Sequence, residues 1–219
     1  MERSELDAQF SFLVEADKLK SVERANTLND LSRQENSAEH SWHLALYAMV
    51  LAGQAAPGVD LNRVIRMLIL HDLVEIDVGD VPLHSGNGAA HGAPEIKAAE
   101  AAAAQRLFGM LPEAQGAEFL ALWEEFEAAE SPDAVFAKSL DRTQPLAQNL
   151  ASNGVNWRRF NVTRENVETD NFQGQALPDA GRASARRLME LAAAENGIVI
   201  TGHDPDDWAD LDYAPLFYD

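Results

Sequence analysis

The stretch that decides the fold is Val64-Ile65-Arg66-Met67-Leu68-Ile69-Leu70-His71-Asp72, an apolar run that ends in two polar side chains. The run starts after Asp60 and its apolar residues recur at the helical spacing, so it predicts a buried helix. His71 and Asp72 then lie at the rim of that helix, where a nitrogen and an oxygen ligand stand side by side. The sequence therefore predicts a helical core with a polar centre at the end of one helix.

Two further side chains, on separate predicted helices, could converge on this pair. His40 falls in the first turn of a helix that the capping-box pattern Asn36-Ser37-Ala38-Glu39 opens and that runs to about Gln54. Asp141 lies in the middle of a helix that starts at Ser131-Pro132 and extends to about Leu150. Two His and two Asp form a mixed nitrogen and oxygen set, which suits a divalent transition metal better than calcium. Such a set leaves coordination positions for water, so it indicates a metal-activated hydrolase.

The remaining periodic segments also predict helices. The segment Glu5–Leu19 carries an apolar stripe, and further helices are expected at residues 94–108, 113–128, 164–172 and 177–196. Residues 76–92 are rich in Gly and Pro and read as a loop, and residues 153–161 read as an irregular polar stretch. The strand-like run at residues 198–201 is too short and isolated for a sheet. We therefore predict an all-α fold, a single helical domain over residues 1–219 with the metal site between helices. Its core would span about 13–150, with C-terminal helices and an acidic tail at 151–219.

Composition and charge restrict the function classes. With 17 Lys and Arg against 36 Asp and Glu, the net charge is −19, which disfavours a nucleic-acid polymer as partner. The chain has no cysteine, so any metal must be held by His, Asp, Glu or backbone groups. We see neither a signal-peptide pattern nor an apolar stretch long enough for a membrane, and expect a cytoplasmic protein. A small phosphorylated substrate stays compatible with this charge if the pocket is locally cationic.

Two carboxylates near His71-Asp72 add chemistry to the predicted ligand set. Glu75 follows His71 by four residues on the same helix face, and Asp80 comes just after a turn at Gly79. Carboxylates beside a metal are candidates for orienting water and moving protons. Taken singly, each of these residues has an ordinary structural explanation, and only their combination on several helices indicates a site. Other histidines are expected to be packed or exposed: His43, His84, His91 and the His203-Asp204 dipeptide.

The segments at residues 35–41 and 71–80 resemble the HD superfamily of metal-dependent phosphohydrolases, and within it the branch of the 5′-deoxynucleotidases. The resemblance spans roughly residues 13–150. It implies that His40, His71, Asp72 and Asp141 bind one divalent metal: Mn, Fe, Co, Ni or Zn, with Mg as an alternative. It further implies that Glu75 and Asp80 are catalytic, that Arg24 faces the substrate phosphate, and that the protein is a homodimer.

One departure from that family concerns the segment Arg24-Ala25-Asn26-Thr27, where a tryptophan is expected close behind the arginine. Its absence leaves phosphomonoester chemistry in place but puts a preference for deoxyribose in doubt. The leading interpretation is a phosphohydrolase acting on a small phosphomonoester, best a nucleoside 5′-monophosphate. Two alternatives stay open: a phosphodiesterase or nucleotide triphosphohydrolase of the same superfamily, and a metal-stabilised binding domain without catalysis.

Overall fold

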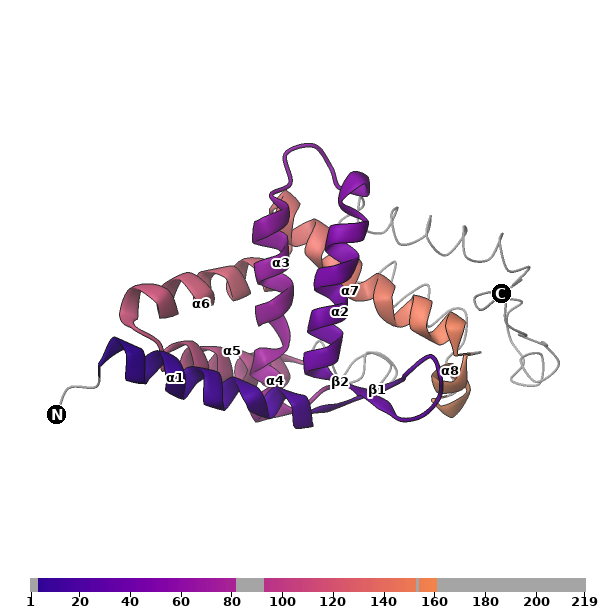
Figure 1. The fold of residues 1–219 in the computed structure, drawn as a ribbon, viewed down its shortest axis with the longest axis horizontal. Coiled ribbons are helices and arrows are strands. Elements are labelled where there is room, and N and C mark those ends of the chain that lie inside the picture. The colour runs from indigo at the N-terminus through magenta and orange to yellow at the C-terminus, as the bar shows by residue number, and fades with distance from the viewer. Residues whose placement is uncertain (1–3, 82–92, 153, 161–219) are drawn as a thin grey trace.

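The computed structural model describes residues 4–81, 93–152 and 154–160, and helices dominate this part of the chain (Figure 1). The α-helices are α1 (Glu5–Ala16), α2 (Ser37–Val50), α3 (Leu61–Leu70), α4 (Glu75–Val78), α5 (Pro94–Phe108), α6 (Glu113–Ala128), α7 (Pro132–Ala151) and α8 (Val155–Arg159). Short 3-10 turns are η1 (Asp17–Ser21), η2 (Ala52–Gln54) and η3 (His71–Val74), and the strands are β1 (Glu23–Thr27) and β2 (Gln34–Asn36). The predicted helical fold class is confirmed.

Helix α3 lies at the centre of the domain and packs against α2, α6 and α7. Figure 1 shows α2 and α3 side by side, with α7 crossing them and α1, α5 and α6 extending to one side. The central core is formed by fully buried side chains, among them Leu44, Val64, Met67, Leu68, Leu107, Phe108, Leu122 and Phe126. None of the described helices is long and apolar enough to cross a membrane.

Local sequence signals set most of the helix ends. Asn36 accepts a hydrogen bond from the Glu39 N–H while the Glu39 carboxylate accepts one from the Asn36 N–H, so the predicted capping box is present. Asp60 caps α3 in a similar way. Helix α2 ends at Val50, four residues earlier than predicted, and the last predicted residues form η2 instead.

Three expectations about secondary structure were wrong, the first being that residues 23–36 contain no strand. Strands β1 and β2 form an antiparallel hairpin that pairs Glu23 with Asn36 and Thr27 with Gln34. Its strands carry no apolar alternation, so the period-2 signal of a strand is absent. Residues 76–78 belong to α4 rather than to the loop expected at 76–92, and α8 occupies part of the stretch expected to be irregular. The helices expected at 164–172 and 177–196 and the run at 198–201 lie outside the described residues.

The apolar stripe of α1 faces solvent rather than the core. Its members are 60–71% exposed: Leu6, Phe10, Leu13 and Val14. The buried apolar residue of α1 is Phe12, which meets the rings of Phe108 and Phe119, and Leu19 of η1 is buried as well.

Candidate active site

The four predicted ligands meet between α2, α3 and α7. The Nε2 atom of His40 lies 3.1 Å from Asp141 Oδ1 and 3.9 Å from Asp72 Oδ2. The Nε2 atom of His71 lies 2.9 Å from Asp72 Oδ1 and 3.6 Å from Asp141 Oδ1. His40, His71 and Asp72 are buried, and each offers a ligand atom within 4.8 Å of the others, a spacing that one metal ion could bridge. We call His40, His71, Asp72 and Asp141 together the His/Asp cluster.

Each imidazole has its second nitrogen engaged on the side away from the cluster. His40 Nδ1 lies 3.1 Å from Gln144 Oε1, an oxygen that only accepts, so Nδ1 has a partner for its proton when Nε2 is used for a metal. His71 Nδ1 donates in the same way to the backbone carbonyl of Leu68 at 2.9 Å. With a metal bound, each Nδ1 would keep its proton and each Nε2 would offer its lone pair to the ion, the arrangement of metal-binding histidines.

The fit of the cluster to a divalent ion can be judged from one buried atom. His71 Nε2 has no hydrogen bond of acceptable geometry among the described residues, although Asp72 and Asp141 lie nearby. An unpaired buried nitrogen is costly, and a cation between imidazole and carboxylates would satisfy it. The donor set of two imidazole nitrogens and carboxylate oxygens fits a divalent transition metal.

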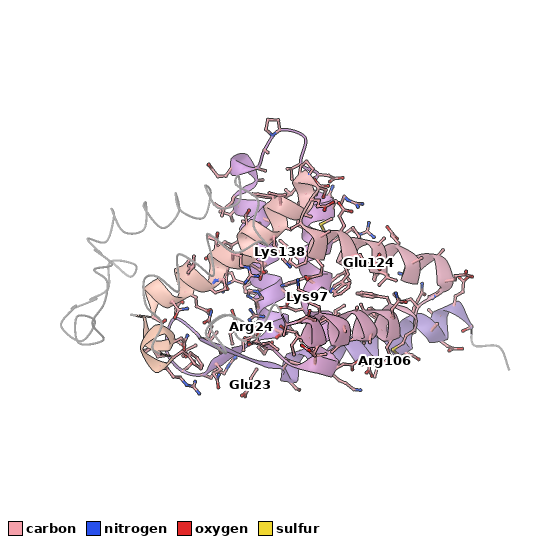
Figure 2. The ribbon with its side chains drawn as sticks, turned by 180° about the vertical axis from the view of Figure 1, so that it is seen from behind. Glu23, Arg24, Lys97, Arg106, Glu124 and Lys138 are labelled. Atoms are coloured by element: carbon pink, nitrogen blue, oxygen red, sulfur yellow. The ribbon has the colours of Figure 1, made fainter. Side chains whose placement is uncertain are left out.

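Aromatic residues of α6 hold His71 in place. Trp123 Nε1 donates to the His71 carbonyl at 3.2 Å, and the Phe126 ring packs edge-on against the imidazole with centroids 4.9 Å apart. Lys138 of α7, labelled in Figure 2, lies 4.0 Å from the centroid of the Phe126 ring and 2.7 Å from Glu127. Helix α7 thus supports the cluster twice, through Asp141 directly and through Lys138 one turn earlier.

Helix α7 contains a proline, Pro145, four residues after the ligand candidate Asp141. Pro145 has no N–H, so the carbonyl of Asp141, four residues before it, receives no helical hydrogen bond there. The side chain of Asp141 is 16% exposed, more than either histidine. This ligand candidate therefore lies at the open side of the cluster.

Arg24 connects the hairpin to the carboxylates. Its Nη1 atom lies 2.8 Å from Asp72 Oδ2, 3.5 Å from Glu75 Oε1 and 3.6 Å from Asp80 Oδ1. Asp80 is returned to this position by Gly79, whose φ of +75° is in the region that favours glycine, and it accepts from the Ala25 N–H at 3.3 Å. Glu75 accepts a hydrogen bond from Ser37 at the start of α2. All three sequence-predicted functional residues outside the His/Asp cluster are thus brought to its edge.

Burial and charge shift the pKa values of the two histidines in opposite directions. Burial, followed by the nearby Arg24 charge, lowers the pKa of His40 to about 4, so this side chain is neutral at pH 7. Burial also acts to lower the pKa of His71, but Asp72 and Asp141 outweigh it and raise that pKa to about 10. A metal at the cluster would compete with this proton, because a ligating imidazole must be neutral.

The carboxyl groups divide in the same manner. Burial acts to raise the pKa of Asp72, but His71 and Arg24 outweigh it and hold that pKa below its usual range. Burial acts to raise the pKa of Asp141, but the hydrogen bond with His40 and the nearby His71 outweigh it and keep that pKa low. Burial, reinforced by the Asp72 charge, raises the pKa values of Glu75 and Asp80. The low pKa values of Asp72 and Asp141 suit metal ligands, which must be ionised. The raised pKa values of Glu75 and Asp80 suit groups that transfer protons.

Several supporting residues carried no signal in the sequence. Gln144 is fully buried and orients His40, and Ser37 contacts Glu75, yet neither residue type marks a metal site by itself. His43 is packed against Trp42 and Tyr47, as expected for a histidine outside the ligand set. Asn26, in the segment where an aromatic residue was expected, accepts a hydrogen bond from Asn149 of α7. His84, His91 and His203-Asp204 lie outside the described residues.

Taken together, the fold and the cluster define a class of protein: a helical domain with a candidate metal centre of two histidines and two aspartates between its helices. The family described as HD domain matches residues 16–178, so this protein belongs to the HD-domain family. The family assignment made from the sequence is confirmed. The matched region extends beyond the expected core, and the division into core and tail stays a prediction.

Relatives and solved structures agree with this assignment. The chain is 46% identical to a protein of Magnetospirillum magnetotacticum MS-1, whose crystal structure is titled a predicted metal-dependent phosphohydrolase; the TM-score is 0.75 over 86% of this chain and 95% of that one. It is 30% identical to the human 5′-deoxynucleotidase HDDC2 over 63% of this chain and 64% of that protein. With the 5′-deoxynucleotidase hdd1 of Schizosaccharomyces pombe the identity is 25%, over 60% and 65%. The match thus spans less than two thirds of these curated relatives, whose names support the predicted enzyme class.

Proposed function

We propose that this protein is a metal-dependent phosphohydrolase that releases phosphate from a small phosphomonoester, with a nucleoside 5′-monophosphate as the best candidate substrate. The observation that carries the proposal is the pair of buried Nε2 atoms that face Asp72 and Asp141 while both Nδ1 atoms are engaged elsewhere. In this proposal His40, His71, Asp72 and Asp141 hold one divalent ion. The 5′-deoxynucleotidase names of the curated relatives add the phosphate-monoester chemistry.

When bound, such an ion supplies Lewis acidity to a phosphoryl group and to a water molecule. Arg24 supplies the fixed positive charge for the phosphate. In the structure its guanidinium is shared among Asp72, Glu75 and Asp80. Added positive charge at the cluster would reduce the hold of these carboxylates on Arg24, and so make the guanidinium available to the substrate phosphate.

Glu75 and Asp80 carry the proton transfers in this proposal. Both lie beside Arg24, where a phosphate would be held, and the pKa of each is raised by burial. A carboxyl group with a raised pKa can hold a proton near neutral pH and deliver it to a leaving alkoxide. Either of them can orient the attacking water while ionised.

Phosphate release from a substrate panel tests the proposal. Purified protein is loaded separately with Mn, Fe, Co, Ni, Zn or Mg and offered nucleoside 5′- and 3′-monophosphates, diphosphates, triphosphates and cyclic monophosphates. We expect turnover of 5′-monophosphates and none of cyclic substrates. Cyclic or triphosphate substrates alone would point to the phosphodiesterase or triphosphohydrolase alternative, and full metal content without turnover to the binding domain.

The sugar is tested in the same assay with AMP and dAMP. Neither Ala25 nor Asn26 has an aromatic side chain that could form a wall beside a sugar. The Ala25 N–H donates to Asp80, and the Asn26 side chain accepts from Asn149. A site without a close wall discriminates weakly against an added hydroxyl. We expect kcat/KM for AMP and dAMP within about tenfold, a difference of ~1.4 kcal/mol. A deoxy preference well above a hundredfold would contradict this.

A further inference from the structure

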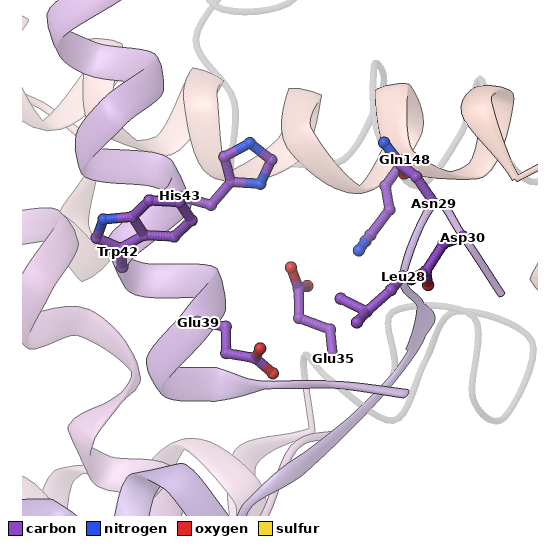
Figure 3. A pocket seen from close by; sticks show the side chains of 8 residues that line it. All are labelled: Leu28, Asn29, Asp30, Glu35, Glu39, Trp42, His43 and Gln148. Carbon is purple, nitrogen blue, oxygen red and sulfur yellow. The ribbon is translucent and has the colours of Figure 1, made fainter. Parts of the chain in front are cut away.

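A buried carboxylate behind the His/Asp cluster has no part in the reaction proposed above. Glu35 lies in β2 and lines a pocket together with His43 and Gln148. Figure 3 shows its carboxylate pointing away from the hairpin, toward α7. The residue is only 2% exposed, and burial of a carboxylate is costly unless other groups compensate for it. The groups around Glu35 therefore indicate what this side chain does.

Glu35 does not contact the ligand candidate His40 directly. Its Oε2 atom lies 3.7 Å from His40 Nδ1, too far for a hydrogen bond, whereas Gln144 Oε1 lies 3.1 Å from the same nitrogen. The other carboxylate oxygen, Oε1, accepts a hydrogen bond from Gln144 Nε2 at 3.3 Å. Glu35 thus reaches His40 through the side-chain amide of Gln144.

The partners of the Gln144 amide select one of its two orientations. An ionised carboxylate only accepts hydrogen bonds, so Glu35 requires the NH2 group of the amide on its side. The same amide nitrogen lies 3.4 Å from His43 Nδ1, and burial lowers the pKa of His43, which favours a neutral ring that can accept. In the reverse orientation the amide oxygen would face both of these acceptors, and the NH2 group would face His40.

The orientation of this amide decides which nitrogen of His40 is free for a metal. With its oxygen toward His40, Gln144 accepts the Nδ1 proton, and Nε2 can bind the ion. With its NH2 group toward His40, Nδ1 would have to be the acceptor. The proton of the neutral ring would then be on Nε2, the atom that faces Asp141 and Asp72. A protonated Nε2 cannot bind a metal.

The three side chains are closed to solvent, and a second role for Glu35 competes with this one. Gln144 and His40 are fully buried, so bulk water cannot replace a lost partner. Arg24 Nε lies 4.0 Å from Glu35 Oε2, and its positive charge offsets part of the cost of burying the carboxylate. Glu35 could thus serve as a counter-ion of Arg24 alone. The two roles predict different results for metal binding.

We propose that Glu35 is a positioning residue, which fixes the Gln144 amide and through it directs His40 Nε2 to the metal. The inference rests on the proposed function, because it takes the His/Asp cluster as a metal site. Without the carboxylate, only the more distant His43 nitrogen still favours the required orientation of the amide. Part of the protein then has the His40 proton on Nε2, and metal affinity falls although every ligand is present.

Competition between a chelator and the full-length protein for Co²⁺ tests the proposal. The measurement is made at about pH 8, where the carboxylate is ionised, because burial, opposed by Arg24, raises the pKa of Glu35 to about 7. We expect Glu35→Gln to bind Co²⁺ about tenfold more weakly than wild type, the lower end of the range for residues behind a ligand. Glutamine has nearly the same shape but carries a donor that competes for the Gln144 oxygen. Glu23→Gln, which removes an exposed carboxylate from β1, should bind Co²⁺ normally.

The same substitution in a Gln144→Leu background separates the two roles. If Glu35 acts through the amide, Glu35→Gln lowers the affinity no further there, within about twofold. Glu35→Met, which has a similar length and no acceptor, should give the same pattern, and it replaces Glu35→Gln if that variant does not fold.

Three results would overturn the proposal: equal Co²⁺ affinities of wild type and Glu35→Gln, the same loss with and without the Gln144 amide, or a comparable loss in Glu23→Gln. Absence of Co²⁺ binding by the wild type would contradict the ligand assignment and this proposal together. Metal binding needs no turnover, so the outcome is separate from that of the substrate panel.

Discussion

Asp72 is the residue on which the candidate centre depends most, because it lies close to both histidines of the cluster and to Arg24. It lies 2.9 Å from His71 Nε2, 2.8 Å from Arg24 Nη1 and 3.9 Å from His40 Nε2. Its pKa is held low by His71 and Arg24 against the effect of burial, so it is ionised and able to bind a cation. Removal of the Asp72 carboxylate should therefore lower the metal content of the protein.

We predict that Asp72→Ala removes the bound metal and the activity while the helical circular-dichroism signal is largely kept. The hydrophobic core around Met67 and Leu68 does not involve this carboxylate, which explains why the helices should persist. Elemental analysis of the purified variant measures the effect, and Asp77→Ala is the control, since Asp77 pairs with Arg106 away from the cluster. Metal content equal to wild type would contradict the ligand assignment.

Glu75 should affect turnover without affecting metal content. It meets Arg24 and Ser37 but no described histidine of the cluster within ion-pair distance. We predict that Glu75→Gln retains the metal and lowers kcat by ~10²–10⁴, the size of a lost acid–base contribution. Steady-state kinetics on metal-replete protein measures this, with Glu23→Gln, an exposed change on β1, as the control. An unchanged kcat would remove Glu75 from the mechanism.

At the scale of the element, α7 positions more of the site than any single residue indicates. It provides Asp141 to the cluster, Gln144 behind His40, and Gln148 to a pocket that Glu35 and Trp42 also line, each about one turn after the last. We predict that Gln144→Leu lowers metal affinity about 10–100-fold, because His40 loses the acceptor that fixes its proton on Nδ1. Competition with a chelator measures the affinity. The matched variant Gln148→Leu, one turn further, should bind metal normally, and equal affinities in all three proteins would show that Gln144 does not orient His40.

Helix α5 carries a carboxyl group that makes stability depend on pH. Burial, followed by repulsion from Glu127, raises the pKa of Glu100 to about 7, against 4.5 for an ordinary glutamate. The folded protein thus holds this proton more tightly than the unfolded chain, and the contribution to stability is lost as pH rises from about 4.5 to 7. We predict that Glu100→Gln reduces the loss of unfolding free energy across this window. Urea denaturation at several pH values measures it, and Glu95→Gln, an exposed change on α5, should behave as wild type.

How far the sequence predicts these elements depends on the range of the forces that form them. The capping box, the Pro94 start of α5 and the apolar run of α3 are local signals, and the helices they predict are present. The β1–β2 hairpin has polar strands, and its contacts are made with distant elements: Arg24 with Asp72, and Thr27 with Asn156. No local pattern encodes such contacts, so the hairpin was missed.

The site shows the same division. His40, His71, Asp72 and Asp141 could be selected because few residue types bind metals and each stood beside an apolar stripe. Gln144, Trp123 and Phe126 were missed because they are ordinary residues of a buried helix until the fold brings them against the two imidazoles. Leu6, Phe10, Leu13 and Val14 formed a correct helical stripe, but periodicity does not tell whether a stripe meets the core or solvent.

At the scale of the whole molecule, the net charge of −19 opposes the approach of any phosphate. The positive charge at the site is local: Arg24 is 14% exposed and already surrounded by Asp72, Glu75 and Asp80. Repulsion between distant surface charges and a substrate is screened by salt, with a Debye length of ~30 Å at 0.01 M and ~8 Å at 0.15 M. Contacts inside a buried site are screened much less. Salt should therefore weaken the repulsion more than it weakens binding.

We predict that kcat/KM for a nucleoside 5′-monophosphate rises severalfold when ionic strength goes from low to physiological at saturating metal, while kcat changes little. The direction follows from the sign of the net charge, since screening removes a barrier to encounter rather than an attraction. Initial rates across a series of KCl concentrations measure both constants, and replacing KCl with potassium acetate tests whether the anion itself inhibits. A steady fall in kcat/KM with both salts would mean that Arg24 and the metal dominate the field that the substrate meets.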